Sequence, residues 1–176
     1  MRGNTNVFLI GPMGSGKTAV GRQIARSLEL PFYDSDAEIE RRTGVDIPFI
    51  FDKEGEAGFR EREREALAVL TAMQGIVLAT GGGAVLLPQN RQLLRGRGRV
   101  VYLETSVGQQ AHRVRHGRHR PLLDEVDPAV RLGQLMDARA PLYAEIADLT
   151  VPTDGRRVQA VAEQILRELA EMQRQP

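Results

Sequence analysis

The sequence predicts a three-layer α/β fold, with helices on both faces of a five-stranded parallel sheet. Three observations lead to this fold class. Short apolar runs have the length and composition of buried strands, and stretches with apolar residues at helical spacing separate one run from the next. A glycine-rich segment also joins the first apolar run directly to the first helical stretch. Because parallel strands need crossover connections of this kind, the alternation favours βαβ units over an antiparallel sheet.

The first half of the chain supplies three of these strands and four helices. The strands are expected at residues 7–10, 31–34 and 76–79. The helices are expected at residues 18–28, 37–42, 47–51 and 56–73. In the first helix Val20, Ile24 and Leu28 recur on one face, as in an amphipathic helix. Gly44 is expected to end the second helix, and Asp46 to cap the third.

The second half completes the alternation. Strands are expected at residues 99–103 and 149–151. Helices are expected at residues 88–95, 106–114, 128–138 and 156–171. Pro88 and Pro128 suit the first turn of their helices, where the missing N–H costs nothing. Residues 116–125 are polar and lack an apolar stripe, so no packed helix is expected there.

The composition is that of a single globular domain spanning residues 1–176. Hydrophobic residues make up 41% of the chain and charged residues 27%. The formal net charge of +1 gives no global field that would attract nucleic acid or a membrane surface. The lack of cysteine excludes a disulfide scaffold and thiolate metal sites. With no apolar stretch of signal-peptide or membrane-spanning length, we expect a cytoplasmic protein.

The segment GPMGSGKT at residues 11–18 fits the pattern G-x-x-x-x-G-K-[ST] in full, between a predicted strand and a predicted helix. This pattern is typical of a loop that binds the phosphates of a nucleoside triphosphate. Glycines let backbone N–H groups approach phosphate oxygens, and the following helix directs its positive end to the same place. We expect Lys17 to contact the β- and γ-phosphates and Thr18 to ligate Mg²⁺. Further nucleotide contacts are expected from Gly14, Ser15, Gly16 and Ala19.

Two aspartates, Asp34 and Asp36, follow the second predicted strand. Ligands of doubly wound sheets bind beyond the carboxyl ends of the strands, which places both carboxylates near the phosphate loop. We expect the segment to be extended and the two acids to have different roles. Asp34 is the candidate for positioning Mg²⁺, because residues 76–79 contain no aspartate, and Asp36 is the candidate proton acceptor. A turn or a helix cap is the alternative role.

Three glycines, Gly81, Gly82 and Gly83, follow the third predicted strand. They favour close approach of a ligand to bare N–H groups, although a simple flexible turn is the alternative. Arg60 and Arg139 are candidates for holding a carboxylate, which a guanidinium can bind bidentately. By pattern alone, each arginine is more typical of a solvated surface charge.

Together these segments resemble the shikimate kinase family over nearly the whole chain. The matching segments are residues 11–18, 34–36, 39–40, 42–44, 54–56, 59–61, 79–83, 120–123, 139 and 141–143. Many kinases share the phosphate loop, whereas the paired aspartates, the triple glycine and the Arg-Pro-Leu-Leu segment at residues 120–123 are far more specific.

The resemblance implies an ATP-dependent kinase with a P-loop, nucleoside-monophosphate-kinase-like fold. It implies transfer of the γ-phosphoryl group to the 3-hydroxyl of shikimate, a step of aromatic amino acid biosynthesis, by a protein that we expect to be monomeric. It implies a substrate-binding helical segment at about residues 34–62 and a lid at about residues 114–126. The implied roles are catalysis by Asp36, Lys17 and Arg120, shikimate contacts from Asp36, Arg60, Gly81, Gly82, Gly83 and Arg139, and nucleotide contacts from Arg113, Arg120 and Arg156.

Two other functions remain open at this point. A different small-molecule P-loop kinase, such as a gluconate kinase or a nucleotide kinase, would share the phosphate loop. A regulator that binds ATP without phosphorylating anything would share it too. Phosphorylation of shikimate would separate the first alternative from the family assignment, and any acceptor-dependent ADP release would separate the second.

Overall fold

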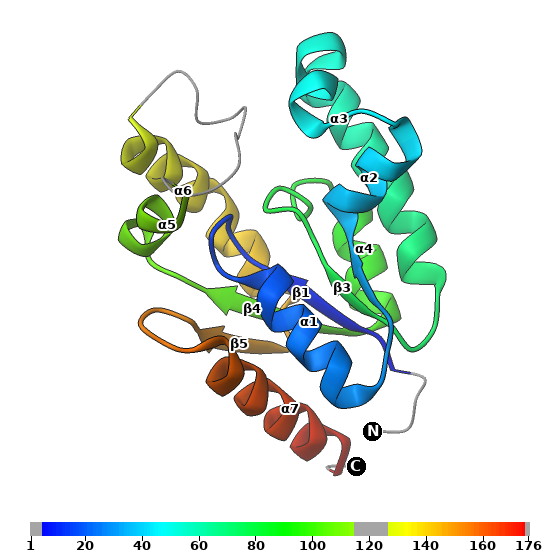
Figure 1. Ribbon diagram of the computed structural model, residues 1–176, viewed down its shortest axis with the longest axis vertical. Coiled ribbons are helices and arrows are strands. Elements are labelled where there is room, and N and C mark those ends of the chain that lie inside the picture. The colour runs from blue at the N-terminus through cyan, green and yellow to red at the C-terminus, as the bar shows by residue number, and fades with distance from the viewer. Residues whose placement is uncertain (1–4, 115–126, 175–176) are drawn as a thin grey trace.

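The computed structural model describes residues 5–114 and 127–174 and has the predicted three-layer architecture (Figure 1). Its sheet is parallel throughout, with the strands in the order β2-β3-β1-β4-β5. The strands are β1 (Val7–Ile10), β2 (Phe32–Asp34), β3 (Val77–Ala79), β4 (Arg99–Glu104) and β5 (Leu149–Pro152). The helices are α1 (Lys17–Leu28), α2 (Ser35–Thr43), α3 (Ile47–Ala72), α4 (Pro88–Arg97), α5 (Val107–Val114), α6 (Pro128–Ile146) and α7 (Val158–Arg174). The predicted fold class is confirmed.

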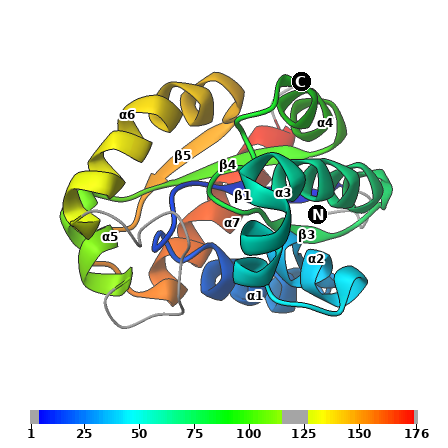
Figure 2. The same cartoon turned by 90° about the horizontal axis from the view of Figure 1, so that it is seen from above.

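The alternation of side chains along β1 shows how the three layers form. Val7 and Leu9 belong to an apolar cluster with residues of α1 and α7, whereas Phe8 and Ile10 belong to a second cluster with residues of α3, α4 and α6. Because successive side chains of a strand point to opposite faces, one short strand contributes to both cores. Figure 2 shows α4 and α6 on one side of the sheet and α1 on the other.

The place of β1 in the sheet determines where ligands can bind. It lies between β3 and β4, so the chain builds the sheet first on one side of β1 and later on the other. In open parallel sheets a crevice forms beside such a point, at the carboxyl ends of the strands. The phosphate loop (residues 11–18), the start of α2 and the glycine loop between β3 and α4 (residues 80–87) all follow strand ends at this edge.

Backbone caps set the bounds of α2. The Asp34 carboxylate accepts hydrogen bonds from the backbone N–H groups of Asp36 (3.0 Å) and Ala37 (3.1 Å). This cap lets the helix begin at Ser35, earlier than predicted. At the other end Gly44 has a φ of 74°, a value that favours glycine, and the predicted stop is confirmed.

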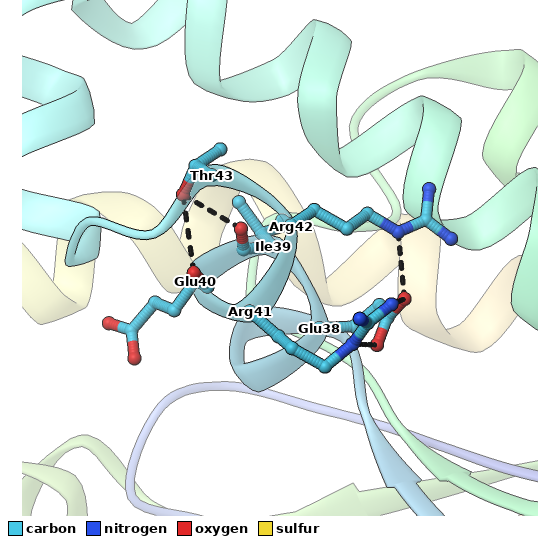
Figure 3. A network of polar contacts seen from close by, with 6 residues as sticks. All are labelled: Glu38, Ile39, Glu40, Arg41, Arg42 and Thr43. Atoms are coloured by element: carbon cyan, nitrogen blue, oxygen red, sulfur yellow. Dashed lines mark hydrogen bonds and ion pairs between the residues drawn. The ribbon is translucent and has the colours of Figure 1, made fainter.

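Side-chain contacts stabilise the rest of α2 (Figure 3). Glu38 accepts hydrogen bonds from Arg41 (2.8 Å) and from Arg42 (2.7 Å). These bonds, the one from Arg41 foremost, lower the pKa of Glu38 to about 2. At the last turn the Thr43 hydroxyl donates to the carbonyl of Ile39 at 2.9 Å. Ion pairs between residues three or four positions apart on a helix, such as those of Glu38, typically contribute ~0.3–0.5 kcal/mol each to its stability. They therefore stabilise the helix locally without determining how it packs.

Helix α3 combines the two helices predicted at residues 47–51 and 56–73. Asp46 caps it as predicted, by accepting a hydrogen bond from the backbone N–H of Phe49 at 2.9 Å. Gly55, with φ 70° and ψ −178°, interrupts the helical path between the two parts. Although α3 is 26 residues long, neither it nor any other helix in the described ranges has the length and apolar character needed to cross a membrane.

Helix α6 continues beyond its predicted end at residue 138. It runs to Ile146 with Pro141 inside it. Arg139, Tyr143 and Ile146 are buried along this extension. Their packing outweighs the backbone hydrogen bond that a proline cannot make, which sequence periodicity alone does not reveal.

Candidate active site

A cleft of about 980 Å³ opens at the carboxyl edge of the sheet, a volume in the range of small-molecule sites. Most of the predicted site residues line it, namely Gly14, Gly16, Lys17, Thr18, Ala19, Asp34, Asp36, Arg60, Gly81, Gly82, Gly83, Arg113 and Arg139. Ser15 is buried within the phosphate loop, and Arg156 is not part of the lining. Arg120 and nearly all of the predicted lid lie outside the described residues.

The phosphate loop has the conformation that its glycines permit. Gly14 and Gly16 have φ values of 78° and 90°, which other residues rarely adopt. Gly16 immediately precedes α1 and provides no side-chain cap. The Lys17 ammonium donates to the carbonyls of Gly11 and Pro12, each at 2.8 Å. A lysine ammonium therefore lies at the N-terminus of a helix in the cleft, an arrangement suited to phosphate oxygens.

Thr18 and Asp34 lie together beside this loop. The Thr18 hydroxyl donates to Asp34 Oδ2 at 3.0 Å, while Asp34 Oδ1 caps α2. The expectation of an extended Asp34–Asp36 segment is wrong, because this cap starts a helix at Ser35. Hydroxyl and carboxylate oxygens are ligands that suit Mg²⁺. No group of three or more acidic, histidine or cysteine side chains in the described part of the chain could hold a metal ion by itself.

The glycines of the glycine loop make room for side chains of the site. None of the three has a positive φ. A Cβ on Gly81 would lie 2.9 Å from both Asp36 Oδ1 and Glu63 Oε2. A Cβ on Gly83 would lie 2.5 Å from Arg60 Nη1 and 2.6 Å from Arg60 Cζ. Glycine is thus required at these positions because the protein's own charged groups approach the backbone closely, and not only because a ligand is expected to do so.

Hydrogen bonds from three helices help to hold the glycine loop in place. The backbone N–H of Gly81 donates to the Ser35 hydroxyl at 3.0 Å. The Tyr143 hydroxyl donates to the carbonyl of Gly82 at 2.5 Å. Buried Asn90 of α4 donates to a backbone carbonyl further along the loop at 3.0 Å. Because its anchors come from three helices, the loop has a fixed position at the cleft.

Arg60 and Glu63 form a buried ion pair on α3. Arg60 Nη1 lies 2.9 Å from Glu63 Oε1, and the two residues are 9% and 0% exposed. Burial raises the pKa of Glu63, and the charge of Arg60 opposes that shift. Glu63 is absent from the predicted site residues, although the sequence carried a signal. It follows Phe59 by four residues and precedes Leu67 by four, so it shares their buried helix face.

Arg139 of α6 faces the same part of the cleft. It is 4% exposed, and burial lowers the pKa of its guanidinium. Its Nη1 lies 3.4 Å from the position a Cβ on Gly82 would take. Neither Arg139 nor Arg60 is the solvated surface charge that the sequence pattern favoured. A desolvated guanidinium binds an anion more strongly than an exposed one, because water competes less.

The nucleotide side of the cleft depends on α5. Arg113 of this helix donates to the carbonyl of Gly14 at 2.6 Å, which joins α5 to the phosphate loop. Asp154, in the loop after β5, accepts hydrogen bonds from the Thr105 hydroxyl (2.5 Å) and the Ser106 backbone N–H (3.1 Å) just before α5. Arg156 donates to the carbonyl of Pro152 at the end of β5. Asp154 thus fixes the start of the helix that carries Arg113, a contact that the sequence did not predict.

Comparison with known proteins identifies the family. The family model described as shikimate kinase matches residues 13–170. The chain belongs to the shikimate kinase family. A shikimate kinase of Thioalkalivibrio sulfidiphilus is 58% identical over 95% of this chain and 88% of its own length, and one of Pseudomonas syringae pv. tomato is 56% identical over 95% and 97%. The solved structure of shikimate kinase from Acinetobacter baumannii in complex with shikimate matches with a TM-score of 0.95 at 46% identity, covering 98% of this chain and 96% of that one.

Membership of the shikimate kinase family confirms the resemblance predicted from the sequence. Members of this family are ATP-dependent kinases, and the P-loop kinase fold of this chain agrees with that chemistry.

Proposed function

We propose that this protein transfers the γ-phosphoryl group of ATP to the 3-hydroxyl of shikimate, giving shikimate 3-phosphate and ADP. The observation that supports it most directly is one cleft with two chemically distinct ends. One end is a phosphate loop with a lysine at a helix N-terminus. The other end has two buried arginines and an aspartate around a loop of glycines. A ring acid with a hydroxyl acceptor matches the second end.

Arg60 and Arg139 bind the carboxylate of the acceptor. They come from α3 and α6, and both flank the glycine loop. Two guanidinium groups from different helices can fix the direction of a planar carboxylate as well as its position. Residues 34–62 would form the substrate-binding segment, with the lid predicted at residues 114–126 closing over the nucleotide and keeping water out.

Asp36 orients the attacking hydroxyl and accepts its proton. It lies in the cleft against Gly81, close to Glu63 and across from the phosphate loop. Phosphoryl transfer depends mainly on alignment and on balancing the charge of the transferring group. Lys17 supplies one positive charge at the phosphates, and Arg120 from the predicted lid supplies a second.

The residues beside the phosphate loop fit Mg²⁺. The Thr18 hydroxyl would be a direct ligand and Asp34 would act through water, with the remaining ligands coming from the nucleotide. When bound, Mg²⁺ neutralises part of the phosphate charge. Asp34 then has a double role, because its second oxygen also holds the start of α2, where Asp36 lies.

The test is shikimate-dependent ADP release in the presence of ATP and Mg²⁺, measured on the wild type and on Asp36→Asn. General bases typically contribute 10²–10⁴-fold, so we expect turnover to fall by at least about 10² in the variant while ATP still binds. Asp52→Asn is the matched control, since this aspartate is exposed on α3 and outside the cleft lining. A wild type that binds ATP but releases no ADP in response to shikimate would rule out the proposed acceptor.

A further inference from the structure

Tyr143 connects the apolar core to the acceptor end of the cleft. Its side chain is completely buried in the cluster that contains Phe8 and Ile10 of β1. Its ring stacks on that of Tyr102 in β4, with the ring centroids 5.0 Å apart. A ring packed on both the sheet and a helix cannot change rotamer without disturbing the core. Its hydroxyl is therefore held at a defined point.

The hydroxyl of Tyr143 lies at the acceptor end of the cleft. It donates to the carbonyl of Gly82 at 2.5 Å. Arg139 lies one helical turn earlier on α6 and lines the same small cavity as Tyr143. Gly82 and Arg139 also lie close to each other, since a Cβ on Gly82 would be 3.4 Å from Arg139 Nη1. The Tyr143 hydroxyl is thus bonded to a backbone group that lies beside the buried guanidinium.

Holding the Gly82 carbonyl also orients the next peptide N–H. The carbonyl of Gly82 and the N–H of Gly83 belong to one peptide unit, and no peptide bond in the described chain is cis. In a trans peptide these two groups point in opposite directions. The bond to Tyr143 therefore directs the Gly83 N–H away from that hydroxyl, and Gly83 itself lies against Arg60.

We propose that Tyr143 is a positioning residue for the acceptor, whose hydroxyl sets both the glycine-loop backbone at Gly82 and the guanidinium of Arg139 to receive the acceptor's carboxylate. It acts through these two groups and does not touch the reacting atoms. This inference rests on the proposed function. It predicts that loss of one oxygen atom affects the acceptor more than the nucleotide, because the hydrogen bond of the Tyr143 hydroxyl goes to the glycine loop and not to the phosphate loop.

The experiment compares Tyr143→Phe with Tyr102→Phe. Each variant loses one hydroxyl from one ring of the same stacked pair, and both rings are at least 96% buried in the wild type. For Tyr143→Phe we expect the KM for shikimate to rise about tenfold, equivalent to ~1.4 kcal/mol. The KM for ATP should stay within about twofold, and binding of shikimate alone, measured by calorimetry, should weaken by the same factor. Tyr102→Phe should leave both KM values within about twofold.

Several results would overturn the role of Tyr143. One is a KM for shikimate in Tyr143→Phe that equals the wild-type value, and another is an equal rise of both KM values, which indicates general loosening. If the phenylalanine variant is unstable, Tyr143→Met removes the same hydroxyl with a flexible side chain and must show the same split between substrates. A wild type without shikimate-dependent turnover would refute the proposed function itself, whereas normal wild-type turnover beside an unaffected Tyr143→Phe refutes only the role of Tyr143.

Discussion

Replacement of Gly83 by alanine should displace Arg60 without unfolding the protein. The φ of Gly83 is not positive, so an alanine can adopt the same backbone conformation. Its new Cβ would lie 2.5 Å from Arg60 Nη1, whereas ordinary van der Waals contact begins at 3.4 Å. Because Arg60 Nη2 lies closer still, the guanidinium must move by at least about 0.9 Å, the difference between these two distances. Because this group is the far end of a long side chain, it moves more easily than the backbone does.

A shift of this size breaks the contacts that hold Arg60. Its bonds to Glu63 and Glu56 are 2.9 Å and 3.2 Å long, and lengthening them by the full displacement takes them beyond hydrogen-bonding distance. A hydrogen bond to a charged group is worth ~1.5–3 kcal/mol. Loss of one such bond to the acceptor corresponds to a rise of roughly 10- to 150-fold in the KM for shikimate, since every ~1.4 kcal/mol is a factor of ten. Misplacement by about 1 Å can also lower kcat by ~10².

The assay is ADP release as a function of shikimate and of ATP concentration. We expect the KM for shikimate to rise in Gly83→Ala and the KM for ATP to stay within about twofold. Gly133→Ala is the control, because a Cβ at this position on α6 meets nothing within 4 Å. A Gly83→Ala variant with a normal KM for shikimate would show either that Arg60 does not hold the acceptor or that the loop yields in its place.

Two further predictions follow from the charged groups. Burial raises the pKa of Glu63 in the folded protein, so the folded state favours the protonated carboxyl. The stability that this residue contributes is full below the pKa of about 4.3 that it has in the unfolded chain, and is lost as pH rises through its folded pKa. Urea unfolding should therefore show the wild type losing stability relative to Glu63→Gln across that window, and a constant difference would refute the shift. The hydrogen bonds from Ser106 and Thr105 lower the pKa of Asp154, so its contribution is present above about 3.9 and is lost as pH falls through the folded pKa. Asp154→Ala should raise the KM for ATP about fivefold, ~1 kcal/mol, with no change for shikimate, and an equal rise for both substrates would contradict a role confined to the nucleotide side.

The features that sequence predicted well depend on neighbours along the chain. The phosphate loop is a contiguous motif, and its glycine conformations and its helix follow from eight consecutive residues. The strands follow from short apolar runs, and their parallel pairing follows from the helices between them. The N-terminal cap at Asp46 and the stop at Gly44 are local backbone effects, and both are found as predicted.

The features that sequence missed depend on tertiary contacts. The spacing of Glu63 from Phe59 and Leu67 puts it on a buried helix face, but its contact with the glycine loop joins distant parts of the chain. The extension of α6 past Pro141 depends on packing of Tyr143 and Ile146 against the sheet. The hydrogen bond from Tyr143 to Gly82 joins residues 61 positions apart. No pattern within a helix or strand contains that information.

The position of the glycine loop explains why three glycines in a row are needed. Gly81 lies against Asp36 of α2, Gly82 against Arg139 of α6, and Gly83 against Arg60 of α3. Gly81 also lies against Glu63 of α3, so three helices place charged groups on this loop, and the loop is their common surface. A side chain at Gly81 or Gly83 would displace the charged groups beside it. At Gly82 a Cβ would lie 3.3 Å from the backbone N of Met13 in the phosphate loop and 3.4 Å from Arg139 Nη1. It follows that the proposed base and the two carboxylate-binding groups all pack against the same loop. The residues that anchor this loop, Tyr143 among them, therefore influence how accurately the acceptor hydroxyl is aligned with the phosphate.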